Sequence, residues 1–263
     1  MNIIDSHVHL PSPGIDFTWE WAPFTLTLSR AIEYLKRCGI HQIIANSVRG
    51  QIAKTHKEII AGNDEIIQIA NNNNSFVIPA CLVNPNFASE SLEEIIRCHE
   101  LYKVNWIGEL CNYIGGFSYT SNSFHDIVEL ATKLNMIIQI HNDDTQQMSE
   151  LCFQHPETTF ILAHLGDSPE EVKERIQLAS IHPNLYLDIS GHGHQRMGVL
   201  ELAVEIAGAE KVLFGSDYTI NDPAGVIARI EKSYLTENIK QNILEQNVLT
   251  LIKKHKSNLT NPI

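Results

Sequence analysis

The chain has 263 residues, of which 43% are hydrophobic and 19% are charged, a composition typical of a soluble globular protein. Its formal net charge of −12 argues against general nucleic-acid binding, which requires a basic face. We find no apolar run of about 18 residues and no secretory signal, so we expect no membrane segment. Five cysteines without a close pair predict free thiols and a cytoplasmic location.

Short runs rich in β-branched residues recur along the chain at a mean spacing of about 30 residues, the size of one βα unit. The runs are nearly continuous in apolar character, as expected for parallel strands that are covered by helices. We therefore predict strands at 2–9, 41–47, 76–83, 105–111, 136–141, 158–164, 185–190 and 211–217.

Segments with helical periodicity lie between these runs. Ser91 and Glu94 have the spacing of a capping box, and Pro169 follows Asp167 and Ser168 as in the first turn of a helix. The pattern predicts helices at 27–38, 51–73, 89–102, 121–135, 145–155, from 169 onward, 195–208, 223–233 and 236–255.

The regular alternation of strand and helix predicts one domain over residues 1–263, folded as a (β/α)8 barrel. A doubly wound open sheet is the alternative, but no Gly-rich phosphate turn follows the first predicted strand. Residues 10–26 are predicted to form a long loop after that strand. Its Trp19, Trp21 and Phe24 either cover a substrate pocket or anchor the loop by packing.

Ionisable side chains stand at the C-terminal tips of five predicted strands. His7 and His9 are two residues apart, so a strand directs both imidazoles to one side. The C-terminal tips of barrel strands converge on one face, where active sites lie. An ionisable group that follows an apolar run is costly to bury unless it is paired or coordinated. The sequence therefore predicts a divalent metal site built from His7, His9, Glu109, His141, His164 and Asp217.

Short motifs surround these side chains: Asp5-Ser6-His7-Val8-His9, Gly108-Glu109, Gln139-Ile140-His141, Ala163-His164-Leu165-Gly166 and Gly215-Ser216-Asp217. Together they resemble the amidohydrolase superfamily, in particular its amidohydrolase-2 branch and the TatD-like metal-dependent hydrolases. The resemblance covers essentially the whole chain and implies a TIM barrel with one or two divalent metals at its mouth.

The resemblance also implies a role for each ligand. His7, His9 and Asp217 would hold the first ion, and His141 and His164 a second, with Glu109 bridging the two. In members with a single ion, the residue at the position of His164 orients or polarises the substrate. Zinc is the expected metal, and the same ligands suit manganese, iron or nickel.

The ligand set predicts a metal-dependent hydrolase of a small ester, lactone, amide or phosphoester. Metal coordination can bring the pKa of water to about 7 and so provide hydroxide at neutral pH. Asp217 would accept the proton and pass it to the leaving group, and His164 would assist. The alternatives are a nonoxidative decarboxylase of the amidohydrolase-2 branch, a TatD-like nuclease and a metal-binding barrel without catalysis.

The sequence allows two roles for each of three other polar residues near the strand tips. Asp5 either orients a ligand or makes a strand-end hydrogen bond. His192 and His194 either contact substrate or lie at the surface, and Cys111 is expected to be a packed thiol. The expected partner is a small-molecule substrate, with no nucleic acid and no membrane, and the sequence is compatible with a homo-oligomer.

Overall fold

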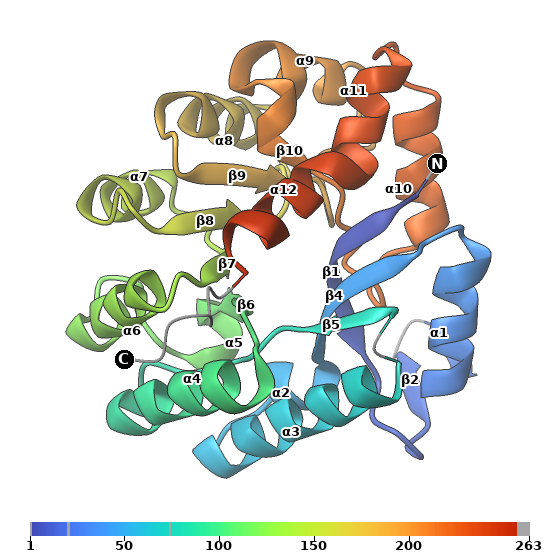
Figure 1. The fold of residues 1–263 in the computed structure, drawn as a ribbon. Coiled ribbons are helices and arrows are strands. Elements are labelled where there is room, and N and C mark those ends of the chain that lie inside the picture. Colours follow the sequence, from blue (N-terminus) through green and yellow to red (C-terminus); the bar gives the residue numbers. More distant parts are fainter. Residues whose placement is uncertain (1, 20–21, 74, 257–263) are drawn as a thin grey trace.

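The computed structural model of the chain describes residues 2–19, 22–73 and 75–256. Within these residues a parallel barrel is formed by eight strands, β1 (Ile4–Leu10), β4 (Gln42–Ser47), β5 (Val77–Pro79), β6 (Trp106–Cys111), β7 (Ile137–His141), β8 (Thr159–Leu162), β9 (Leu185–Asp188) and β10 (Val212–Leu213). Hydrogen bonds join them in the orders β1-β4-β5 and β6-β7-β8-β9-β10. Parallel bridges from Cys81 to Ile107 and from Val8 to Tyr218 close the ring (Figure 1). The predicted (β/α)8 barrel is confirmed.

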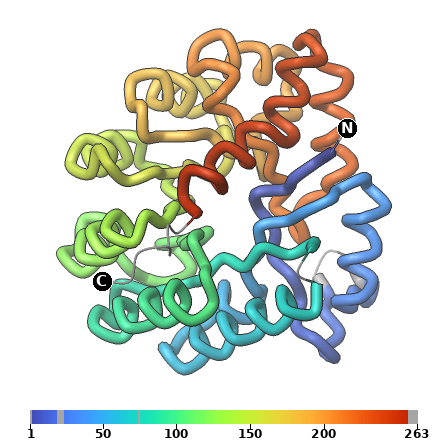
Figure 2. The backbone as a smooth tube through the Cα atoms, in the orientation of Figure 1, coloured from blue at the N-terminus to red at the C-terminus, as the bar shows by residue number. Residues whose placement is uncertain are grey.

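Helices surround the barrel and follow the strands in chain order, as the tube in Figure 2 shows. Their bounds are α1 (Leu28–Arg37), α2 (Val48–Gln51), α3 (His56–Asn72), α4 (Ala88–Tyr102), α5 (Asn112–Gly115), α6 (Asn122–Lys133), α7 (Thr145–Gln154), α8 (Pro169–Ile181), α9 (Val199–Ala207), α10 (Pro223–Glu231), α11 (Glu237–Gln241) and α12 (Asn247–Lys254). Short 3₁₀ and π turns cover Ala209–Lys211 and Asn242–Gln246.

Local side-chain contacts explain where several helices begin. The Ser168 hydroxyl accepts a hydrogen bond from the backbone N–H of Glu171, whose carboxylate reaches back to the N–H of Ser168. This capping box, with Pro169 in the first turn, fixes the start of α8. Thr55 and Glu58 form the same motif at α3.

The amino ends of the barrel strands are filled by apolar side chains and covered by the last helix. Ile4, Ile44 and Trp106 belong to a buried cluster that also contains Val248 and Leu251 of α12. In Figure 1 this helix crosses in front of the ring of strands. Since one end of the barrel is closed in this way, the predicted site lies at the other end.

The structure differs from the sequence predictions at several elements. The eighth strand, predicted at 211–217, is shortened to Val212–Leu213, and the last helix, predicted at 236–255, is divided by the π turn at Asn242–Gln246. Residues 10–26 contain an antiparallel hairpin of β2 (Phe17–Trp19) and β3 (Ala22–Leu26), not only a loop; Trp21 lies outside the described residues. The predicted 51–73 helix is interrupted, because α2 ends before Thr55 caps α3. The third predicted strand is shortened to Val77–Pro79.

The predicted capping box of Ser91 and Glu94 is wrong. Helix α4 begins earlier, at Ala88, and the Ser91 hydroxyl donates to the carbonyl of Asn84 at 2.8 Å. The Glu94 carboxylate instead accepts hydrogen bonds from Asn63 and Arg97.

No helix among the described residues is both long and apolar enough to cross a membrane.

Candidate metal centre

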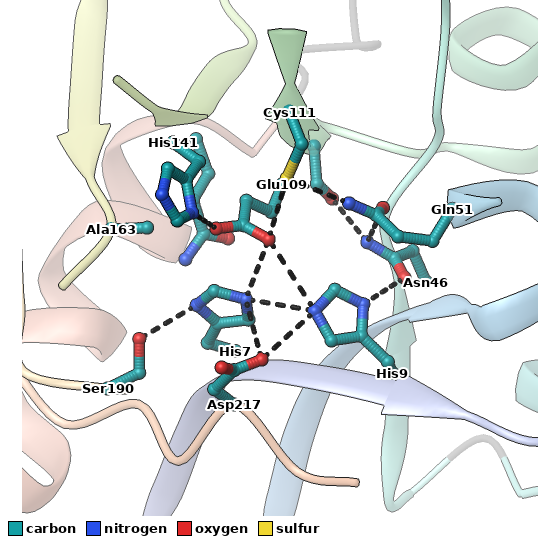
Figure 3. A network of polar contacts seen from close by, with 12 residues as sticks. His7, His9, Asn46, Gln51, Glu109, Cys111, His141, Ala163, Ser190 and Asp217 are labelled. Atoms are coloured by element: carbon teal, nitrogen blue, oxygen red, sulfur yellow. Dashed lines mark hydrogen bonds and ion pairs between the residues drawn. The ribbon is translucent and has the colours of Figure 1, made fainter. Parts of the chain in front are cut away.

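The six predicted ligands come together at the carboxyl ends of the strands, as the ion pairs among them show. Figure 3 shows five of them, His7, His9, Glu109, His141 and Asp217. Five of the six ligands are buried, and the sixth, His141, is half-buried. The structure therefore brings the side chains at these strand tips together, as the sequence predicts.

His7, His9 and Asp217 form the tightest group. The Nε2 atoms of the two imidazoles face each other at 3.1 Å, and Asp217 Oδ1 lies 3.3 Å from His9 Nε2 and 3.7 Å from His7 Nε2. This carboxylate oxygen is buried and makes no hydrogen bond within the described residues. Three atoms of this kind that converge without protein donors between them match the ligand set of a divalent cation.

The other nitrogen of each imidazole fixes its tautomer. His7 Nδ1 donates to the Asp188 carboxylate at 2.6 Å, and His9 Nδ1 donates to Asn46 Oδ1 at 2.6 Å. Asn46 Nδ2 donates to the carbonyl of Gly108, which sets which end of the amide faces His9. In the neutral imidazoles both Nε2 lone pairs therefore point toward Asp217, as metal coordination requires.

Sequence reasoning missed these orienting residues. Asp188 ends β9 and Asn46 is the last residue but one of β4, so their position after an apolar run is a usable signal. Gln139 lies in the motif that ends at His141. Its amide connects Asp188, to which it donates at 2.9 Å, with Trp106, from which it accepts at 3.0 Å.

Glu109 divides its two oxygens between the histidines. Oε2 lies 3.4 Å from His7 Nε2 and 3.6 Å from His9 Nε2. Oε1 lies 3.2 Å from His141 Nδ1 and 3.4 Å from His164 Nε2. A carboxylate in this position can bind one ion or bridge two.

His164 is held by a hydroxyl and by its backbone. Its Nδ1 lies 3.0 Å from Ser190 Oγ, whose proton goes to Asp188 at 2.9 Å, so Nδ1 is the donor and Nε2 faces Glu109 unprotonated in the neutral ring. His164 and Asp217 both adopt positive φ, at 67° and 59°. Such backbone conformations are uncommon for these residue types and concentrate at functional sites.

Neighbouring charges shift the pKa values of the residues in the centre. Burial alone would lower the pKa of His7, but the carboxylates of Glu109 and Asp188 outweigh it and hold the pKa well above its usual value. Asp217 and Glu109 likewise raise the pKa of His9 to about 9. Burial would raise the pKa of Glu109, yet the charge of His7 and hydrogen bonds from His141 and His164 keep it well below its usual value. The carboxylates of the centre thus favour positive charge at its imidazoles.

Asp5 acts on the backbone. Its Oδ1 accepts hydrogen bonds from the N–H groups of His7 at 3.1 Å and Ser216 at 2.9 Å, which ties β1 to the segment before Asp217. Burial raises the pKa of Asp5 to about 7 against these hydrogen bonds. Of the two expectations for Asp5, the strand-end hydrogen bond is the one observed.

The remaining predicted residues are found in varied surroundings. His194 is buried, whereas the side chain of His192 is 65% exposed and lies 3.6 Å from Asp167. Phe24 is exposed on the wall of a cavity of about 540 Å³ with Tyr34 and Tyr218, and no predicted metal ligand lines it. The side chain of Trp19 lies outside the described residues. All five cysteines are free.

Comparison with known proteins agrees with the site. The sequence profile of the family described as Amidohydrolase matches residues 4–251, so the chain belongs to the amidohydrolase family, of the amidohydrolase-2 type. No curated protein matches the chain. The family and the His7–His9–Asp217 group together support a divalent-metal-dependent enzyme. Neither this match nor the similar structures support the TatD-like part of the resemblance.

Solved structures of low sequence identity share the fold. An uncharacterised TIM-barrel protein from Bordetella bronchiseptica has 15% identity and a TM-score of 0.78, covering 98% of this chain and 100% of its own. A 2,6-dihydroxybenzoate decarboxylase from Rhizobium has 14% identity and a TM-score of 0.74, covering 96% and 99%. A dihydroxybenzoic acid decarboxylase from Polaromonas, with bound manganese and 2-nitroresorcinol, has 15% identity and a TM-score of 0.72, covering both chains fully.

Proposed function

We propose that the chain is a divalent-metal-dependent decarboxylase that removes carbon dioxide from a small aromatic carboxylate without oxidation. The observation that carries this proposal is the group of His7, His9 and Asp217, which offers three protein ligands to one ion at the mouth of the barrel. The likeness of the whole chain to aromatic acid decarboxylases, one of them bound to manganese, adds support. The main expectation from sequence, a hydrolase, becomes the second candidate.

The ion, when bound, supplies positive charge that can hold the substrate carboxylate and stabilise charge that develops as the carbon–carbon bond breaks. His7, His9 and Asp217 would hold it, and Asp188 and Asn46 keep both imidazoles in the coordinating tautomer. The bond to the carboxyl group breaks, carbon dioxide leaves, and a proton takes its place on the carbon.

Asp217 and His164 are the candidates to handle that proton. Asp217 Oδ2 accepts a hydrogen bond from Asn221 Nδ2 at 3.3 Å, while Oδ1 faces the histidines. His164 Nε2, on the opposite side of Glu109, can hold a proton and polarise the substrate. We propose that Asp217 takes up a proton from solvent on Oδ2 and donates it to the carbon, and that His164 polarises the substrate.

The proposal is tested with protein purified without chelator. Metal per chain is measured by elemental analysis, and release of carbon dioxide is measured on a panel of hydroxybenzoates. We expect activity that chelation abolishes, that manganese or zinc restores, and that Asp217→Asn removes. Asp167→Asn, at an exposed carboxylate outside the metal group, is the matched control and should retain activity. Metal-loaded protein that hydrolyses esters or lactones but releases no carbon dioxide would contradict the proposal.

A metal-dependent hydrolase is the second candidate, and the position of Glu109 favours it. A carboxylate with one oxygen toward His7 and His9 and the other toward His141 and His164 is placed to bridge two ions. Two ions can share a nucleophilic water and also polarise the bond to be cleaved. The need for a second ion distinguishes the candidates: a bridged hydrolase should lose activity when Glu109→Gln reduces two ions per chain to one, whereas a decarboxylase should stay active with the first ion alone.

A further inference from the structure

A thiol lies beside the metal centre in a position set by the strands. Cys111 follows Glu109 by two residues on β6, so both side chains point to the same side of the strand. In the parallel pairing of β6 with β7, Cys111 lies directly opposite His141. One ligand atom from each of Glu109, Cys111 and His141 lies within 4.8 Å of the other two. These three residues form a second group with the chemistry of a metal site.

We infer that Cys111 is itself a metal ligand, which as a thiolate holds a divalent ion together with Glu109 and His141. This ion is separate from the one held by His7, His9 and Asp217. The inference rests on the metal dependence of the proposed function, but the decarboxylase proposal needs only the first ion.

Hydrogen bonds hold the sulfur against the Glu109 carboxylate. In the metal-free protein the Cys111 thiol donates to Glu109 Oε2 at 3.1 Å, and Gln51 Nε2 donates to the sulfur at 3.0 Å. The Gln51 amide oxygen accepts from Asn46 Nδ2 at 3.4 Å, so its N–H end is the one directed at the sulfur. An amide donor on a ligand atom is a typical outer-shell contact of a metal-bound thiolate.

The chain Asn46–Gln51–Cys111–Glu109 also connects the two groups (Figure 3). Asn46 orients His9 in the first group, and Gln51 contacts the sulfur of the second. Both groups are therefore held by one set of side chains, which is the arrangement expected if both bind ions.

Coordination by Cys111 has a balanced chemistry and a consequence for metal choice. The S–H bond is lost, the proton passes to solvent, a sulfur–metal bond forms, and neither sulfur nor metal changes oxidation state. Thiolate is a soft ligand that suits zinc, whereas carboxylate and water suit manganese and magnesium. The second ion is therefore expected to be zinc, even if manganese occupies the first site.

Cobalt(II) is the probe for this inference. The full-length protein is stripped with chelator and titrated with cobalt, while absorption is recorded in the near ultraviolet, where thiolate-to-cobalt charge transfer appears. We expect this band in the wild type and its loss in Cys111→Ser. Cys38→Ser, which replaces a free cysteine on α1's C-terminal cap, should keep the band. Cys111→Ser should also lower the zinc affinity of the second site. Because a ligand is lost, this decrease should exceed the roughly 10–100-fold decrease that loss of an outer-shell partner causes.

The outcomes separate this inference from the proposed function. Cobalt bound to the wild type without a charge-transfer band overturns Cys111 as a ligand and leaves metal dependence intact. A band that persists in Cys111→Ser overturns it as well. Failure of the wild type to bind any divalent ion overturns both. If Cys111→Ser does not fold, the absence of the band in the wild type still overturns the inference.

Discussion

The carboxylate of Asp188 lies 2.6 Å from Nδ1 of His7, a residue 181 positions away in the sequence. Asp188 is fully buried, and it also accepts hydrogen bonds from Gln139 and from the hydroxyl and N–H groups of Ser190. The charge of His7 keeps the pKa of Asp188 below its usual value against the effect of burial. Asp188 is therefore an ionised group that orients a proposed ligand.

Replacement of Asp188 should weaken metal binding without removing a ligand. We expect Asp188→Asn to lower metal affinity by about 10–100-fold, as is usual when the hydrogen-bond partner of a ligating histidine is changed. Competition with a fluorescent chelator measures this affinity. Asp167→Asn changes an exposed carboxylate that also faces a histidine, His192, and should leave the affinity unchanged. Equal metal affinities for the wild type and Asp188→Asn would show that Asp188 does not support a metal ligand.

Gly215 gives a second test of the same contact. A Cβ atom at this position would lie 2.2 Å from Asp188 Oδ1 and 2.9 Å from His7 Cβ, so one of these side chains must move. We expect Gly215→Ala to reduce metal content and activity together. Gly225→Ala is the control, because a Cβ there meets nothing within 4 Å, and alanine in helix α10 should add up to about 1 kcal/mol of stability. Metal content and thermal unfolding of both variants distinguish displacement of the pair from general destabilisation.

The strands and the candidate ligands at their tips can be read from the sequence, because apolar runs and the residues that end them are local features. Asp188 and Asn46 were present at two such tips, but their partners depend on which strand tips face each other across the barrel. His9 finds Asn46 because β1 and β4 pair with those two residues opposite each other. That register is a property of the closed sheet.

The helix starts show that a local sequence pattern can also predict a contact that does not form. Ser91 and Glu94 have a spacing that promotes capping, but tertiary contacts use both side chains elsewhere. Ser168 and Glu171 make the capping box seen in the structure, since nothing distant competes for them. Local patterns are therefore reliable where the side chains remain at the surface, and less so where the core requires polar groups.

His194 should make the stability of the protein depend on acid pH. Burial lowers its pKa to about 4, and the charge of Asp188 offsets only part of this effect. The unfolded chain, with a histidine pKa near 6.5, takes up the proton first, so stability is complete above about pH 6.5 and falls as pH drops toward 4. The loss due to this residue corresponds to about 3 kcal/mol.

Urea unfolding at several pH values measures the contribution of His194. Between pH 6.5 and 4 the wild type should lose more stability than His194→Gln, which carries no titrating group there. His192→Gln, at an exposed position, should follow the wild type. If His194→Gln loses as much stability as the wild type across this range, the buried imidazole is not responsible.

Removal of the metal should destabilise the protein more at alkaline pH than near neutrality. In the metal-free protein the pKa of His9 is raised to about 9, because Asp217 and Glu109 outweigh burial. A histidine with a raised pKa stabilises the folded state fully below its unfolded value of about 6.5, and this stabilisation is lost as pH rises through about 9. A bound ion takes the place of that proton, so the metal-loaded protein lacks this loss. Binding of free metal at 100 times its dissociation constant adds about 2.7 kcal/mol to the free energy of unfolding.

The difference in melting temperature between metal-loaded and chelated protein should therefore be larger at pH 9 than at pH 6.5. A difference that stays constant would show that His9 does not exchange a proton for the ion.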